Sequence, residues 1–157
     1  MEVTKIMTLN LTEVYIERCD KDTEEVISQE QASFLNTPLA HLKTHMNEFI
    51  YIETSSFEPI KTDSFSLEVD DVFKTYMVLL GFKVQKKHAS IIKAYFEENL
   101  HGDNIYSSMM FSGEDGLWDL NIPIDNMKDF HEDMNIQEAV NIIYSFLENL
   151  VSTIEQQ

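Results

Sequence analysis

The feature that most constrains the fold is an amphipathic pattern near the C-terminus. Apolar side chains recur there at spacings that place them on one face of a helix. The residues of this stripe are Ala139, Ile142, Ile143, Phe146, Leu147, Leu150, Val151 and Ile154. Asn135 and Glu138, just before it, have the spacing of a capping box. We therefore expect a C-terminal amphipathic helix that buries Ile143, Phe146 and Leu150 against a sheet carrying Trp118.

Short alternating runs predict the strands of that sheet. Runs at 13–18 and 24–28 flank the polar turn 20–23, and runs at 105–111 and 117–124 flank the glycine-containing turn 112–116. Two further strands are expected at 49–54 and around Phe65, Leu67 and Val69. The fold class that follows is α+β, with a mainly antiparallel sheet of five or six strands.

Three more helices are expected before the C-terminal one. Leu35, Leu39, Leu42, Met46 and Phe49 form a narrow apolar stripe, which predicts a helix over 37–48 that begins at Pro38. The segments 71–80 and 87–100 predict a pair of helices separated near Gly81. About four helices then pack on the sheet in a single domain over 1–157, a usual length for one core.

The chain is strongly acidic. It has 28 Asp and Glu against 11 Lys and Arg, a net charge of −17. Acids are dense in the predicted loops after residue 112, and such a surface attracts basic proteins and speeds their association. The predicted partner-binding residues are Glu114, Asp115, Asp119, Asp129, Glu132 and Asp133.

The order of hairpin, acidic loop and C-terminal amphipathic helix resembles several families of bacterial chaperones and immunity proteins. Together with the charge, this favours a non-enzymatic binding protein of bacterial or phage origin: an immunity protein, an antitoxin-like inhibitor or a small chaperone. A nucleic-acid mimic is the special case in which the partner is itself a nucleic-acid-binding protein.

One segment has the opposite charge. Residues 72–96 contain no Asp or Glu but five lysines. Lys83, Lys86, Lys87 and Lys93 are candidates for anion docking or for self-association with a second copy in a homodimer, and the plainer interpretation is a solvated lysine face. Direct nucleic-acid binding is not expected, because the acidic flanks would repel phosphates and this segment has no arginine to read guanine.

The alternative function is a metal-dependent enzyme or sensor. His41, His45 and Glu48 would lie on one face of the 37–48 helix, and two imidazoles with a carboxylate can bind zinc. The plainer interpretation is that both imidazoles cover the edge of the core, so no stoichiometric metal or other cofactor is expected. The four glycines fit no phosphate-binding loop, and no nucleophile elbow occurs, so enzyme activity is not favoured.

The sequence also predicts a location. The longest apolar run, residues 77–82, is far shorter than a membrane span. The N-terminal residues show no export signal, with Glu2 where positive charge is usual. The single cysteine, Cys19, fits a reducing compartment. We expect a cytoplasmic protein that does not bind membranes.

Overall fold

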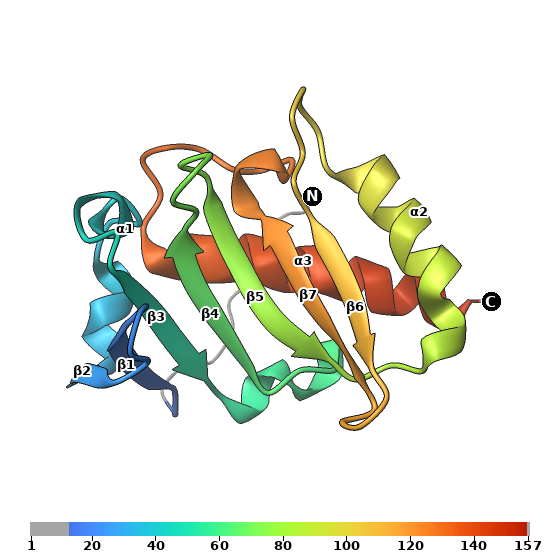
Figure 1. Ribbon diagram of the computed structural model, residues 1–157, viewed down its shortest axis with the longest axis horizontal. Helices are drawn as coiled ribbons and strands as arrows, with labels where there is room; N and C mark the ends of the chain where they lie inside the picture. The colour runs from blue at the N-terminus through green and yellow to red at the C-terminus, as the bar shows by residue number, and fades with distance from the viewer. Residues whose placement is uncertain (1–12, 157) are drawn as a thin grey trace, which may run out of the picture.

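A computed structural model describes residues 13–156, which form a seven-stranded antiparallel sheet (Figure 1). The strands are β1 (Tyr15–Asp20), β2 (Val26–Glu30), β3 (Glu48–Glu53), β4 (Ser64–Val69), β5 (Tyr76–Phe82), β6 (Ser108–Ser112) and β7 (Leu117–Pro123). Their order is β2-β1-β3-β4-β5-β7-β6. The α+β class is confirmed, but the strand count is seven where five or six were predicted. The residues examined for an export signal lie outside the described range.

The C-terminal helix α3 (Ile136–Glu155) is confirmed, and it crosses behind the sheet (Figure 1). Its capping box is present: Asn135 Oδ1 accepts the Glu138 N–H at 2.8 Å, and Glu138 Oε1 accepts the Asn135 N–H at 2.9 Å. Ile143, Phe146 and Leu150 are buried in one cluster with Trp118, as expected.

A second helix, α2 (Ala89–Asn99), lies against α3. The Tyr95 hydroxyl donates to the Phe146 carbonyl at 2.7 Å, and the two rings meet edge to face with centroids 5.0 Å apart. In Figure 1 no helix within residues 13–156 lies over the opposite face of the sheet, which we call the open face. No helix of this described part of the chain is long and apolar enough to cross a membrane.

The helix predicted over 71–80 is wrong. These residues form the turn 70–75 and most of β5, and Val69 pairs with Tyr76 across the turn. Val78, Leu80 and Phe82 alternate into the core, and Gly81 pairs with Asp119 within the sheet. These apolar side chains therefore recur at every second residue, as in a strand, and not at the three- to four-residue spacing of a helix.

The helix predicted over 37–48 is also wrong in extent. Only α1 (His41–Thr44) is α-helical, after the 3₁₀ helix η2 (Ala32–Asn36), and β3 begins at Glu48. The backbone around Pro38 is engaged elsewhere: Leu39 N–H donates to the Met134 carbonyl, and Thr37 accepts the Ile136 N–H. These bonds fix the chain in a non-helical path, while Leu35, Leu39 and Leu42 still enter the core.

The remaining 3₁₀ helices lie in the connections. They are η3 (Ser55–Ile60), η4 (Lys86–His88) and η5 (Ile124–Asn126). The register then defines two ends of the sheet. Connections 20–25, 70–75 and 124–135 lie at one end, and connections 54–63, 83–88 and 113–116 lie at the other.

Candidate partner-binding surface

Two hairpin turns of the same geometry occupy the first end. In turn 20–25, Asp20 N–H donates to the Glu25 carbonyl at 2.9 Å, and Glu24 N–H donates to the Asp20 carbonyl at 2.8 Å. Turn 70–75 has the same two bonds: Asp70 N–H donates to the Thr75 carbonyl, and Lys74 N–H donates to the Asp70 carbonyl, each at 2.9 Å. The fifth residue is left-handed in each, with φ of 64° at Glu24 and 60° at Lys74. Both turns are thus closed, hydrogen-bonded structures.

An aspartate side chain holds each turn. Asp20 Oδ1 accepts the N–H groups of Asp22 at 2.8 Å and Thr23 at 2.9 Å. Asp70 Oδ2 does the same for residues 72 and 73, at 3.0 and 2.7 Å. The hydrogen bonds from Thr23 and Asp22 lower the pKa of Asp20, since they stabilise its charged form. Asp20 and Asp70 therefore shape the turns, while Asp22, Glu24, Glu25 and Asp71 are exposed.

Two side chains, Lys21 and Asp125, tie the connections of this end to each other and to the neighbouring strands. Lys21 Nζ donates to the Val69 carbonyl at 2.9 Å and pairs with Asp71 at 3.0 Å, which links the two turns. Asp125 Oδ1 accepts the Tyr76 N–H at 2.7 Å, which links connection 124–135 to β5. Burial is the main cause of the raised pKa of Asp125.

Charge differs sharply between the two ends. Connections 20–25, 70–75 and 124–135 carry four, two and four carboxylates against one lysine each. We call them together the acidic end. The other end is balanced, because Glu58, Asp63, Glu114 and Asp115 are matched by Lys61, Lys83, Lys86 and Lys87. We call connections 54–63, 83–88 and 113–116 the balanced end.

The structure divides the predicted partner-binding residues between these ends. Asp129, Glu132 and Asp133 are exposed at the acidic end, where Glu132 pairs with Lys43 at 3.6 Å. Glu114 and Asp115 are exposed in the β6–β7 turn, and the length of β7, about 23 Å, separates the two groups. Asp119 lies between them on the open face.

Exposed apolar side chains accompany the acids at the acidic end. Val72 and Phe73 in turn 70–75 are 76% and 46% exposed. Tyr106, from the segment before β6, stacks on Phe73 with centroids 3.7 Å apart and is itself 44% exposed. The sequence analysis missed this stack, because it assigned Phe73 to a helix. The available signal was the Asp that opens each turn, six residues before the next strand.

The predicted lysine residues lie mostly at or near the balanced end. Lys83 pairs with Asp63 at 2.6 Å across exposed surface. Lys86 and Lys87 lie in η4, and Lys93 lies on α2. All three are exposed, and none makes an ion pair within residues 13–156.

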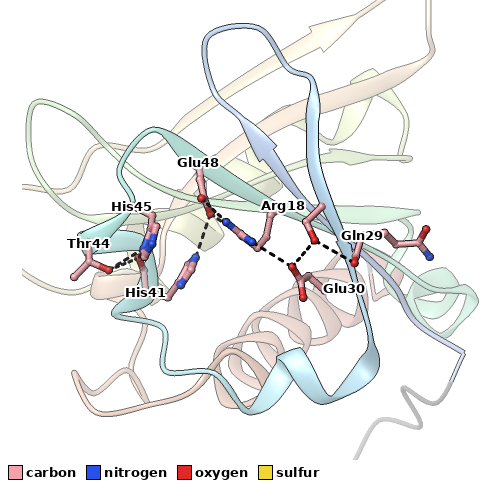
Figure 2. A network of polar contacts seen from close by, with 8 residues as sticks. Arg18, Gln29, Glu30, His41, Thr44, His45 and Glu48 are labelled. Carbon is pink, nitrogen blue, oxygen red and sulfur yellow. Dashed lines mark hydrogen bonds and ion pairs between the residues drawn. The ribbon is translucent and has the colours of Figure 1, made fainter.

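The structure brings His41, His45 and Glu48 together, although not along one helix (Figure 2). The Glu48 N–H donates to the His45 carbonyl, so a turn returns the chain to β3. The candidate ligand atoms of the three residues all lie within 4.8 Å of one another. Glu48 is only 4% exposed.

Glu48 already has partners for both carboxylate oxygens. Arg18 Nε donates to Oε1 at 3.1 Å and Arg18 Nη2 donates to Oε2 at 2.8 Å, a bidentate pair (Figure 2). His41 Nε2 lies 3.1 Å from Oε1, and Arg18 also pairs with Glu30 at 3.3 Å. Arg18 is the main cause of the lowered pKa of Glu48. This network ties β1, β2 and β3 to α1.

The two imidazoles are stacked. Their centroids are 4.0 Å apart and their planes differ by 10°. His45 Nδ1 donates to the His41 carbonyl at 2.9 Å, which fixes the ring. A metal ion lies near the plane of each imidazole that binds it, and nearly parallel, stacked planes share no nearby point. The Arg18 guanidinium also occupies both oxygens of Glu48. The arrangement therefore favours an ion-pair network over a metal centre.

No protein-family model, curated protein or solved structure matches this chain.

Proposed function

We propose that this chain is a non-enzymatic binding protein whose acidic end engages a basic protein partner. The observation that carries the proposal is the segregation of charge: carboxylates outnumber lysines at the acidic end, while the two are equal at the balanced end. A surface with one dominant sign orients an oppositely charged partner and raises its association rate by about 10–10³-fold.

The Phe73–Tyr106 stack supplies an apolar anchor within this field. Protein interfaces combine a small apolar or aromatic centre with a polar, charged rim, and a few central residues carry most of the binding energy. Phe73 lies two residues after Asp71, and its ring stacks on that of Tyr106. Ile105, 36% exposed, extends the apolar surface.

The closed turns support binding in another way. Ordering a loop on association costs free energy, and a loop that is already held in its bound shape avoids this cost. The Asp20 and Asp70 carboxylates each fix two backbone N–H groups of their own turn. The exposed acids between them are therefore presented in a defined arrangement.

The proposal includes an immunity protein, an antitoxin-like inhibitor and a small cytoplasmic chaperone. If the partner is a nucleic-acid-binding protein, the acidic end takes the place of the phosphates it would otherwise bind. Asp129, Glu132 and Asp133 belong to the proposed surface. Glu114 and Asp115 lie at the other end, and we propose that they contribute little.

Two matched charge reversals test the proposal. The first changes Asp22, Asp129 and Asp133 to lysine, and the second changes Glu58, Glu114 and Asp115 to lysine. All six residues are exposed, and the two variants have the same net charge. We expect wild type to retain a basic partner from native lysate, with an affinity that falls as salt rises, and only the first variant to lose it. Equal loss in both variants, or no basic partner for wild type, would refute the proposal.

The alternative, a metal-dependent enzyme or sensor, has its own test. We expect protein purified without an affinity tag to contain no stoichiometric zinc, because Arg18 holds Glu48 and the imidazoles are stacked. One equivalent of tightly bound zinc, lost when His41 and His45 are both changed to alanine, would instead support the alternative.

A further inference from the structure

The strands present acidic side chains but no basic side chain on the open face of the sheet, which lies in front of α3 in Figure 1. The seven strands contain one basic residue, Arg18, and its pairing with the buried Ile50 places it on the opposite face. The acids that alternation places on the open face are Glu17, Glu53, Glu68 and Asp119. A segment laid across these strands would meet carboxylates and no competing cation.

Glu68 lies within an apolar band of this face. It pairs with Met77 of β5, and Met77 pairs with Pro123 of β7. On its other side, the antiparallel register of β3 with β4 places Phe49 opposite it. Met77 is only 8% exposed, and Phe49 and Glu68 are half-buried. The Glu68 carboxylate is therefore surrounded on both neighbouring strands by apolar side chains.

No ion pair within residues 13–156 neutralises this carboxylate. Lys21 attracts it, but Lys21 Nζ is bonded to the Val69 carbonyl and paired with Asp71. Burial raises the pKa of Glu68, and the charges of Asp70 and Asp71 act in the same direction. A charged Glu68 is thus unfavourable for the free chain, which is typical of a position that serves binding and not stability.

We propose that Glu68 receives an arginine side chain of the basic partner, whose neighbouring apolar side chains cover Phe49 and Met77. The inference rests on the proposed function, since the same partner would continue from turn 70–75 onto the open face. A guanidinium donates two parallel hydrogen bonds to one carboxylate, and its flat face packs on aromatic rings. A second copy of this chain, with a net charge of −17, would be repelled from these acids.

A peptide titration tests this site without the natural partner. The probe is the capped tripeptide Leu-Arg-Leu, and its control peptide has the uncharged analogue citrulline in place of arginine. Glu68→Gln removes the proposed acceptor. Asp119→Asn removes an exposed carboxylate from the same face and is the matched control, with the same net charge. Amide chemical shifts should show that Glu68→Gln binds Leu-Arg-Leu about tenfold more weakly than wild type, while Asp119→Asn binds it like wild type.

The pKa of Glu68 gives an independent readout, through the carboxyl carbon shift of the labelled side chain. In the free chain this pKa should lie above the ordinary 4.5, and saturating Leu-Arg-Leu should lower it, because a guanidinium stabilises the charged form. Citrulline peptide should leave it unchanged. A pKa below 4.5 in the free chain would mean that a cation already occupies Glu68, and would overturn the inference.

Equal binding of the two peptides by wild type, or equal binding of Leu-Arg-Leu by wild type and Glu68→Gln, would also overturn it. The captured partner separates this inference from the proposed function. If Glu68→Gln retains the partner as wild type does, while reversal of Asp22, Asp129 and Asp133 abolishes capture, the arginine site is wrong and the acidic end stands. If Glu68→Gln loses Leu-Arg-Leu but wild type captures no basic protein, the arginine site stands and the proposed function is wrong.

Discussion

The acidic end and the balanced end of the sheet are both built from short connections between antiparallel strands, yet they differ in charge and in exposed apolar surface. The difference follows from strand register. Asp115 and Asp129 are close in sequence but lie at opposite ends of β7, while Asp22 and Asp71 are far apart in sequence and lie at the same end. A cluster of acids in sequence is therefore a poor guide to a patch on a sheet protein.

The two ends also differ in their ion pairs, and we expect the largest effect on stability here. Near the acidic end, Arg18→Ala leaves the buried Glu48 without its bidentate partner and should lower the free energy of unfolding by about 3 kcal/mol. At the balanced end, Asp63→Asn breaks an exposed pair with Lys83 and should cost about 0–1 kcal/mol. Urea denaturation measures both values. Similar losses would mean that the Glu48 network does not act as a buried pair.

Removal of the apolar anchor should affect binding more than stability. Phe73→Ala should weaken binding of the captured partner by about 2 kcal/mol, the usual effect of truncating a central interface residue. Its effect on unfolding should be small, because the ring is 46% exposed. Tyr15→Ala is the control, because Tyr15 is 37% exposed and lies at the opposite end of β1, paired with Glu53. Calorimetric titration measures the affinities, and equal effects would place Phe73 outside the interface.

Two glutamates on neighbouring strands near the acidic end should respond oppositely to neutralisation. The lowered pKa of Glu48, caused mainly by Arg18, means that its charged form stabilises the fold above the ordinary pKa of 4.5. This stabilisation is lost as the pH falls through the folded-state pKa. Glu48→Gln should therefore destabilise the protein at neutral pH, by about 1.5–3 kcal/mol.

Glu68 should have the opposite effect on stability, because its pKa is raised, mainly by burial. Its contribution is most favourable when protonated, below the ordinary pKa, and is lost as the pH rises through the folded-state pKa. Glu68→Gln should raise stability at neutral pH by about 0.5 kcal/mol. Thermal unfolding from pH 3 to pH 8 checks both variants, and their differences from wild type should shrink together in acid. A loss of stability in Glu68→Gln at neutral pH would contradict this assignment.

Another small effect on stability concerns the left-handed residues that close the turns. Glycine adopts positive φ without the steric penalty of a side chain, so Glu24→Gly and Lys74→Gly should each raise stability by up to about 1 kcal/mol. Lys61 has φ of 64° in connection 54–63 and is the matched position at the balanced end. Chemical denaturation should give a similar small gain there, since this strain does not depend on charge. Losses at all three positions would mean that side-chain contacts outweigh the strain.

Local sequence patterns predicted the elements whose signals are strong. The Asn135 capping box and the stripe through Phe146 predicted α3, and polar turns predicted both terminal hairpins. Turn 70–75 was missed because Val72 and Phe73 extended an apolar run that looked helical. Its Asp70 plays the same part as Asp20, whose turn was recognised.

The candidate site could be predicted only in part. The sequence identified the acidic character of 129–133 and the proximity of His41 to Glu48. It did not identify Arg18 as the partner of Glu48, because that contact depends on the pairing of β1 with β3. It also grouped Glu114 with Asp133, since the direction of β7 in the sheet cannot be read from a local pattern.

Amide chemical shifts of the isotope-labelled chain, titrated with its captured basic partner, test the central claim most directly. We predict that the largest changes occur at the acidic end, in 20–25, 70–75 and 129–133, and at Tyr106. Residues 54–63, 83–88 and 113–116 should change little. The largest changes at the balanced end instead, around Glu114 and Asp115, would contradict the account.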